Sequence, residues 1–221
     1  MNTIQEFFGS IYRWMVIGVL ISAFAAWLTM NSPLAVIYTN QVYFYGLVAI
    51  QLGLLFGIQW GINKLSASSA FVLYLVYAFA NGVTMAGFLA YFLGTNPQLL
   101  FVIFGAAAAM FGLLAVLGYT TKRDMSGWGT FLIAGMWGVF VASIANAFLQ
   151  NDGFSYIISA VALVVFAGLT VYDNQVYKNM FAQLQDDEQK SKMATLGALH
   201  MYINFIMIFQ SLLNLSRLGQ D

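Results

Sequence analysis

Apolar residues run along this chain in long stretches, and polar residues gather in the short breaks between them. A helix needs about 20 consecutive apolar residues to cross a bilayer core. The alternation with period two that membrane barrels require is absent from the sequence. The pattern predicts an all-α polytopic membrane protein with seven transmembrane helices, at about residues 12–30, 42–62, 69–93, 98–119, 129–149, 154–176 and 194–215.

The breaks carry the residues that turns favour. Turn signals follow the first, third and fifth spans, at Asn31-Ser32-Pro33, Gly94-Thr95-Asn96-Pro97 and Asn151-Asp152-Gly153. Both prolines fall in these breaks, so neither should kink a span. Between the fourth and fifth spans, we expect Arg123 and Asp124 either to pair with each other or to cap the fifth helix.

The longest break, residues 178–193, holds the acidic run 186–188 followed by Lys190 and Lys192. Contiguous carboxylates do not converge on one ion without a preformed loop. A solvated, partly helical connector is therefore favoured over a metal site. Since no break is long enough for a soluble domain, we expect a single seven-helix domain over residues 1–221.

Composition narrows the function classes. Hydrophobic residues make up 61% of the chain and charged residues 7%, against about 25% charged residues in a typical soluble domain. A soluble enzyme and a nucleic-acid-binding protein are excluded, because too little charge is present to solvate or steer them. The lipid bilayer is the expected surrounding. The absence of cysteine excludes disulfides, thiolate zinc sites and cysteine nucleophiles.

The positive residues indicate the orientation, because cytoplasmic loops collect Lys and Arg. Trp27 and Met30 lie near any cleavage point of a signal peptide, so a retained first span is favoured over a cleaved one. With seven spans, only Arg217 falls on the C-terminal side. We expect a cytoplasmic N-terminus and a C-terminus outside. The cytoplasmic positive residues are then Arg13, Lys64, Lys122, Arg123, Lys178, Lys190 and Lys192.

Small residues recur at helical spacing in several spans. Such ridges let the backbones of transmembrane helices approach closely. We expect them to be helix-packing surfaces. They are Gly53, Gly57 and Gly61 in the second span, Gly105, Ala109 and Gly112 in the fourth, and Gly135 with Gly138 in the fifth.

Two ionisable groups, Asp173 and His200, lie inside predicted spans. Each costs roughly 2.5–3.5 kcal/mol on insertion scales, so each is a functional hypothesis. Asp173 is interpreted first as a gate or ion-binding carboxylate, and alternatively as a hydrated group paired with Arg13 or Lys178. The lone His200 is equally compatible with two roles. It could be held by a hydrogen bond to a backbone carbonyl or a side-chain amide, or it could be a titrating group. Asn204 follows one turn later on the same face.

Membrane-embedded catalysis finds little support. Tyr172-Asp173 matches a fragment of intramembrane aspartyl proteases, but these need a second intramembrane carboxylate, and no other Asp or Glu lies in a predicted span. One His cannot supply the three or so ligands of a zinc hydrolase. We expect neither an enzyme nor a bound cofactor.

Three segments of this chain are distinctive: GYTTKRDMSGWG at 118–129, FAGLTVYDNQ at 166–175 and ALHMYINF at 198–205, with a weaker patch NGVT at 81–84. Together they resemble the Bax inhibitor-1 (TMBIM) family of seven-helix membrane proteins. The resemblance covers essentially the whole chain. It implies a bundle with the last helix at its centre and a pH-sensitive calcium leak.

The resemblance also implies a pair of aspartates on the sixth and seventh spans that share a proton and close the pore from the cytoplasmic side. Asp173 matches the first of these, whereas the second is Asn204, and a second-span glutamate of the family is Gln51. The like-charge effect that makes such a pair a pH switch is therefore lost. Asp173 with the amide oxygens of Asn204, Asn174 and Gln51 would be a weak, low-charge calcium site.

An Asp173–His200 pair is our hypothesis for what titrates instead. Opposite charges would hold the two helices together when His200 is protonated, which would close the pore at low pH and loosen it as the imidazole deprotonates. His200, Asp173 and Asn204 are thus the candidate gate and pH-sensing residues, and Gln51 with Asn174 the candidate ion-pathway residues.

The sequence predicts a pH-sensitive calcium or cation leak gated near Asp173 at the cytoplasmic side. The alternative is a non-conducting membrane protein that binds and modulates other membrane proteins, such as a protease or a stress-response factor. Charge loss at Asn204 and Gln51 favours the alternative, and the presence of Asp173 favours the leak. A proton-coupled transporter ranks third. The compact chain, without a targeting extension, favours a bacterial inner membrane.

Overall fold

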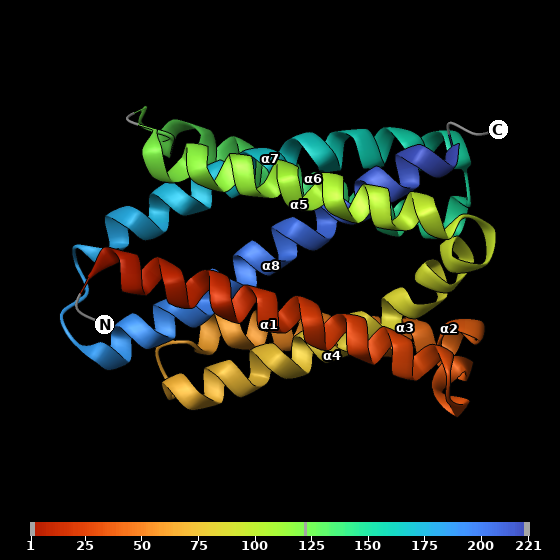
Figure 1. Cartoon of the computed structure of the whole chain (residues 1–221), viewed down its shortest axis with the longest axis horizontal. Helices are drawn as coiled ribbons and strands as arrows, with labels where there is room; N and C mark the ends of the chain where they lie inside the picture. The colour runs from red at the N-terminus through yellow and green to blue at the C-terminus, as the bar shows by residue number, and fades with distance from the viewer. Residues whose placement is uncertain (1–2, 122, 219–221) are drawn as a thin grey trace. The chain divides into compact units, whose positions relative to one another are not determined.

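The computed structural model describes residues 3–121 and 123–218, and over these residues the chain is helical without a strand (Figure 1). Seven of the helices are long and apolar enough to cross a membrane. The prediction of an all-α protein with seven spans is confirmed. The elements are α1 Ile4–Met30, η1 Pro33–Ala35, α2 Val36–Thr39, α3 Gln41–Gly61, α4 Ala67–Thr95, α5 Pro97–Thr120, α6 Ser126–Leu149, α7 Asp152–Phe181 and α8 Asp187–Leu218.

Several helices extend past the apolar stretches that predicted them. Helix α1 begins at Ile4, because the hydroxyl of Thr3 accepts a hydrogen bond from the backbone N–H of Glu6 and caps the first turn. Helix α7 continues to Phe181. Hydropathy marks only the part of a helix that lies in the bilayer core, so it does not find ends that extend beyond it.

The segment between α7 and α8 is therefore shorter than the predicted connector. The Asp186 carboxylate caps α8 by accepting a 2.6 Å hydrogen bond from the backbone N–H of Gln189. Lys192 lies 3.2 Å from Glu188, and Lys190 lies 4.0 Å from Asp187. The acidic run thus caps a helix and forms ion pairs along it.

The polypeptide forms two compact units. The first contains α1 to α4 and α8 up to Tyr202, and the second contains α5 to α7 and α8 from Ile203 onward. Of the 18-residue apolar stretch of α8, 67% is buried, against 11–44% for the other six spans. A single domain over residues 1–221 and a central last helix both stay predictions.

In the first unit, α1 packs along α4 (Figure 1). The two backbones approach closely at Gly82, where an added Cβ would collide with the carbonyl oxygen of Ser22. The Ser22 hydroxyl lies 2.7 Å from the carbonyl oxygen of Ala78 and 2.6 Å from the hydroxyl of Tyr202, which donates to Asn81. These buried polar groups join α1, α4 and the first half of α8.

In the second unit, glycines bring α5 and α6 against α7. A Cβ on Gly118 of α5 would lie 2.6 Å from the carbonyl oxygen of Val171 and 2.7 Å from the Cβ of Asn174. Gly129 of α6 faces the ring of Tyr172 in the same way. These contacts position the C-terminal third of α7, where the candidate site lies.

The predicted glycine ridges are mostly wrong as packing surfaces. A Cβ on Gly53, Gly57, Gly105, Gly112 or Gly138 would meet nothing within 4 Å, and Ala109 is exposed. Gly61 meets only Leu65, four residues further along the chain, at 3.6 Å. Gly135, whose Cβ would lie 3.0 Å from Val165, is the member that the structure confirms. Spacing identifies a smooth helix face, but not which face meets another helix.

Candidate functional site

The structure brings Asp173 of α7 and Asn204 of α8 together within the second unit. The side-chain amide of Asn204 donates a 2.8 Å hydrogen bond to the Asp173 carboxylate. Asn204 is buried, at 3% exposed, and Asp173 is half-buried. A hydrogen bond to a carboxylate is roughly twice as strong as one between neutral groups. This pair therefore links two membrane-spanning helices through residues that are 31 positions apart in the sequence.

Asn174, the next residue of α7, is completely buried. Its side-chain amide donates a 2.7 Å hydrogen bond to the carbonyl oxygen of Thr170, one turn earlier, and its Cβ faces Gly118. Its described contacts are those of a packing residue. Its predicted place in an ion pathway stays a prediction.

His200 and Gln51 both lie in the first unit. The Nε2 atom of His200 is 3.1 Å from the amide nitrogen of Gln59 on α3, so a neutral imidazole would accept a hydrogen bond there. Gln51, at 8% exposed, donates to the carbonyl oxygen of Ala80 and to the Thr84 hydroxyl on α4. The Asp173–His200 pair stays a prediction, because its members belong to different units.

The two cations considered as partners of Asp173 make other contacts. The Lys178 ammonium donates a 2.7 Å hydrogen bond to the carbonyl oxygen of Tyr119 and lies 5.0 Å from the centre of the Tyr119 ring. The Arg13 guanidinium donates to the carbonyl oxygen of Gly9 and to the Ser10 hydroxyl on its own helix. Their described contacts therefore join Lys178 to the end of α5 and Arg13 to earlier residues of its own helix.

The turn between α5 and α6 is held by Gln175. The Gln175 side chain donates a 2.6 Å hydrogen bond to the carbonyl oxygen of Arg123 and accepts a 2.7 Å hydrogen bond from the backbone N–H of Met125. Gln175 ends the family segment 166–175, and the sequence alone predicts no role for it. A side chain that holds a distant turn leaves no periodic signal.

Asp124 lies in the turn just before α6, whose N-cap position is Met125 and carries no side-chain cap, so neither expected arrangement of Arg123 and Asp124 is confirmed. Its carboxylate accepts a 2.9 Å hydrogen bond from the backbone N–H of Ser126. This bond lowers the pKa of Asp124 below its ordinary value of 3.8. Lys122, which the orientation argument also used, lies outside the described residues.

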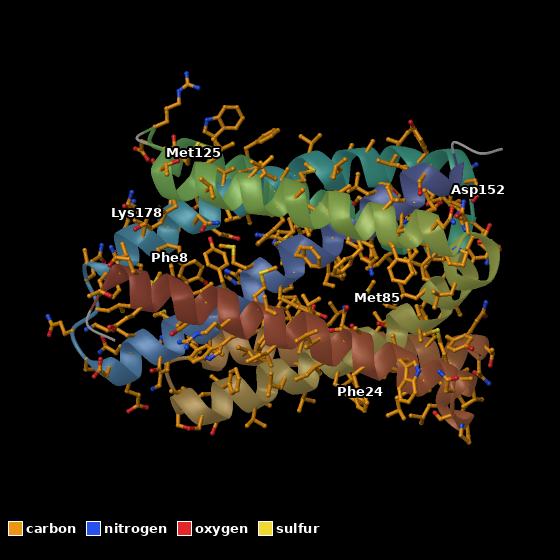
Figure 2. All side chains as sticks on the ribbon, viewed as in Figure 1. Phe8, Phe24, Met85, Met125, Asp152 and Lys178 are labelled. Atoms are coloured by element: carbon orange, nitrogen blue, oxygen red, sulfur yellow. The ribbon has the colours of Figure 1, made fainter. Side chains whose placement is uncertain are left out.

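Lys178 and Asp152 lie at opposite ends of the second unit (Figure 2). Figure 2 shows Met125 and Lys178 at one end of this unit and Asp152 at the other, where Asp152 lies 3.5 Å from Arg217. The side that faces the cytoplasm stays a prediction.

The candidate site is poor in charge. Within residues 3–121 and 123–218, no group of three or more His, Asp or Glu could hold a metal ion. The Asp173–Asn204 pair supplies one carboxylate and one side-chain amide. Calcium usually takes six to eight oxygen ligands, often including several carboxylates. The Asp173–Asn204 pair thus supplies fewer carboxylate ligands than a calcium site usually has.

Seven helices long and apolar enough to cross a membrane, two of them joined by a carboxylate–amide hydrogen bond, define the class of polytopic membrane proteins. The family model described as "Inhibitor of apoptosis-promoting Bax1" matches residues 4–221. The chain belongs to the Bax inhibitor-1 family, which confirms the family predicted from the sequence.

Relatives from distant bacteria share nearly the full length. The inner membrane protein YbhL of Escherichia coli strain K12 is 35% identical over 216 residues, which cover 96% of this chain and 91% of the relative. An uncharacterized protein of Borreliella burgdorferi is 38% identical over 220 residues, which cover 98% of this chain and 92% of the relative. An uncharacterized membrane protein of Streptococcus pyogenes serotype M3 is 32% identical, with coverages of 96% and 92%.

Proposed function

We propose that this protein is a pH-sensitive cation leak of a bacterial inner membrane, with calcium as a transported ion. Asp173 is its gate, and the hydrogen bond from Asn204 holds the gate closed. No enzymatic step is part of the proposal. The inner membrane is proposed because the Escherichia coli relative carries that location in its name.

The observation that carries the proposal is the 2.8 Å hydrogen bond between Asp173 and the buried Asn204. A carboxylate inside a membrane span costs roughly 2.5–3.5 kcal/mol on insertion scales, so its presence calls for a compensating role. A cation that passes along α7 and α8 would compete with the Asn204 amide for the carboxylate oxygen. Such competition supports a slow leak rather than a high-affinity binding site.

His200 is the proposed source of the pH sensitivity. It is the one His of the chain, and His is the side chain whose charge ordinarily changes between pH 5 and 8. Protonation adds a positive charge to α8 and is proposed to close the leak as the pH falls. The variant His200→Ala should then leak at a rate that no longer varies between pH 6 and 8.

Calcium flux into proteoliposomes at pH 6, 7 and 8 tests the leak. Wild type is compared with Asp173→Asn and with the matched control Asp187→Asn, whose carboxylate is 73% exposed outside the apolar stretch of α8. Asp173→Asn replaces a charge-assisted hydrogen bond by a neutral one and weakens it by about 1 kcal/mol, which corresponds to about a fivefold increase in flux. Asp187→Asn should behave as wild type.

Two outcomes would contradict the proposal. Flux that equals that of empty liposomes at every pH would exclude the leak and favour the alternative, a non-conducting protein that binds other membrane proteins. Flux that is present but equal in wild type and Asp173→Asn would retain the leak and exclude Asp173 as its gate.

A further inference from the structure

The last turns of α7 make contacts in several directions within the second unit. Asp173 accepts from Asn204 of α8, Asn174 faces Gly118 of α5, Gln175 holds the α5–α6 turn, and Lys178 donates to the end of α5. Residues in an α-helix are separated by about 100° around its axis. The direction of each contact therefore follows from its position in the sequence.

Gln175 and Asp173 lie on nearly opposite sides of α7. Two positions apart correspond to a rotation of about 200°, whereas Lys178, three positions after Gln175, is only about 60° away from it. Gln175 and Lys178 thus hold one side of α7 to the α5–α6 turn and the end of α5. The Asp173 carboxylate meets Asn204 on the other side.

The Gln175 amide makes two bonds that fix its orientation. Its nitrogen donates to the carbonyl oxygen of Arg123 at 2.6 Å, and its oxygen accepts from the N–H of Met125 at 2.7 Å. A side-chain amide carries both a donor and an acceptor on one planar group, which is what these two bonds require. A glutamate would keep the bond from Met125 and lose the bond to Arg123.

We propose that Gln175 is a positioning residue: by clamping α7 to the α5–α6 turn it fixes the rotation of α7 that directs Asp173 at Asn204. If the clamp is removed, α7 can turn about its axis and the Asp173 carboxylate moves away from the amide. The effect on flux rests on the proposed leak. The effect on the Asp173–Asn204 hydrogen bond does not.

The test uses the side-chain amide of Asn204 as a spectroscopic probe. Its proton resonance in the NMR spectrum of the purified full chain, assigned by its loss in Asn204→Leu, reports the hydrogen bond to Asp173. Asp173→Asn gives the reference position for a bond without the charge. The variant is Gln175→Met, which keeps the length of the side chain and removes both of its hydrogen bonds. The matched control is Gln98→Met, at an exposed glutamine in the first turn of α5.

In Gln175→Met, the Asn204 resonance is expected to move at least halfway to its position in Asp173→Asn, and in Gln98→Met to stay in place. Gln175→Glu, which keeps one bond, should shift less than Gln175→Met, and it replaces Gln175→Met if that variant does not fold. Equal spectra for the Gln175 and Gln98 variants would overturn the proposal and make Gln175 a residue of the turn alone.

Flux measured on the same proteins separates the two proposals. If wild type leaks, Gln175→Met should leak several-fold faster and Gln98→Met should not. If Gln175→Met shifts the Asn204 resonance but leaks at the rate of wild type, Gln175 has no role in gating through Asp173. If wild type does not leak at all, the proposed function fails, and the resonance alone still decides whether Gln175 positions Asp173.

Discussion

At the scale of single residues, Asn204 determines what the Asp173 carboxylate meets. An asparagine offers an N–H group at 2.8 Å, where an aspartate would offer a second carboxylate. The present pair satisfies one negative charge with an amide donor and needs no proton for its stability. This difference predicts how the site responds when a second charge is restored.

Asn204→Asp should make the pH response of the flux steeper than that of wild type. Two carboxylates at this distance cannot both ionise without strong repulsion, so they bind a shared proton more tightly than either group alone. Flux should be low at pH 6, where the shared proton holds α7 and α8 together, and should rise toward pH 8 as the proton leaves. Asn214→Asp adds the same charge elsewhere on α8 and is the control. An equal pH response in both variants would contradict the prediction.

Asp124 should contribute nothing to the pH response of the flux, because its carboxylate stays charged between pH 6 and pH 8. The bond from the Ser126 N–H lowers its pKa below 3.8, so its stabilising effect is complete above that pH and is lost only as the pH falls through the lowered value. Asp124→Asn, which keeps a side-chain oxygen that can accept from the Ser126 N–H, should leave the ratio of flux at pH 6 to flux at pH 8 as in wild type. A changed ratio would identify a role for this charge that the structure does not show.

At the scale of helices, close backbone contact and exposure separate glycines that look alike in the sequence. Gly82 lies against the backbone of Ser22, whereas Gly53 has nothing within 4 Å of an added Cβ. In a helix interior, glycine is about 1 kcal/mol less favourable than alanine. An added methyl group at Gly53 should therefore stabilise α3, whereas one at Gly82 should force α1 and α4 apart.

Gly82→Ala should lower the midpoint of thermal unfolding in detergent, and Gly53→Ala should leave it unchanged or raise it by a few degrees. The collision with the Ser22 carbonyl cannot be relieved by a side-chain rotation, because the contacted atoms belong to the backbone. Circular dichroism or intrinsic fluorescence on heating measures both. A Gly82→Ala protein as stable as Gly53→Ala would show that α1 and α4 can separate at low cost.

The helices themselves were predictable, because crossing a bilayer requires a length and a composition that few other structures share. Their ends were not, since Thr3 and Asp186 cap turns that lie beyond the apolar stretches. The resemblance placed Asp173 and Asn204 at corresponding family positions, and the structure supplies the hydrogen bond between them. The bonds of Gln175 could not be predicted, because they join residues about 50 positions apart without any repeating pattern.

At the scale of the whole molecule, α8 differs from the other spans. It has the largest buried share of its apolar stretch and contributes residues to both compact units. Tyr202 is bonded to Asn81 in the first unit, and two residues later Asn204 is bonded to Asp173 in the second. One continuous helix thus contributes packing residues to both units.

That sharing has a consequence for biosynthesis. A ribosome delivers α8 after every other described helix, so neither unit has all of its residues while the first six spans enter the membrane. In a chain of two sequential domains, a premature stop codon leaves the first domain whole. Here a stop codon before α8 would leave both units incomplete, with Asp173 lacking Asn204 and Ser22 lacking Tyr202. Membrane quality control would therefore meet a truncated chain that is incomplete throughout.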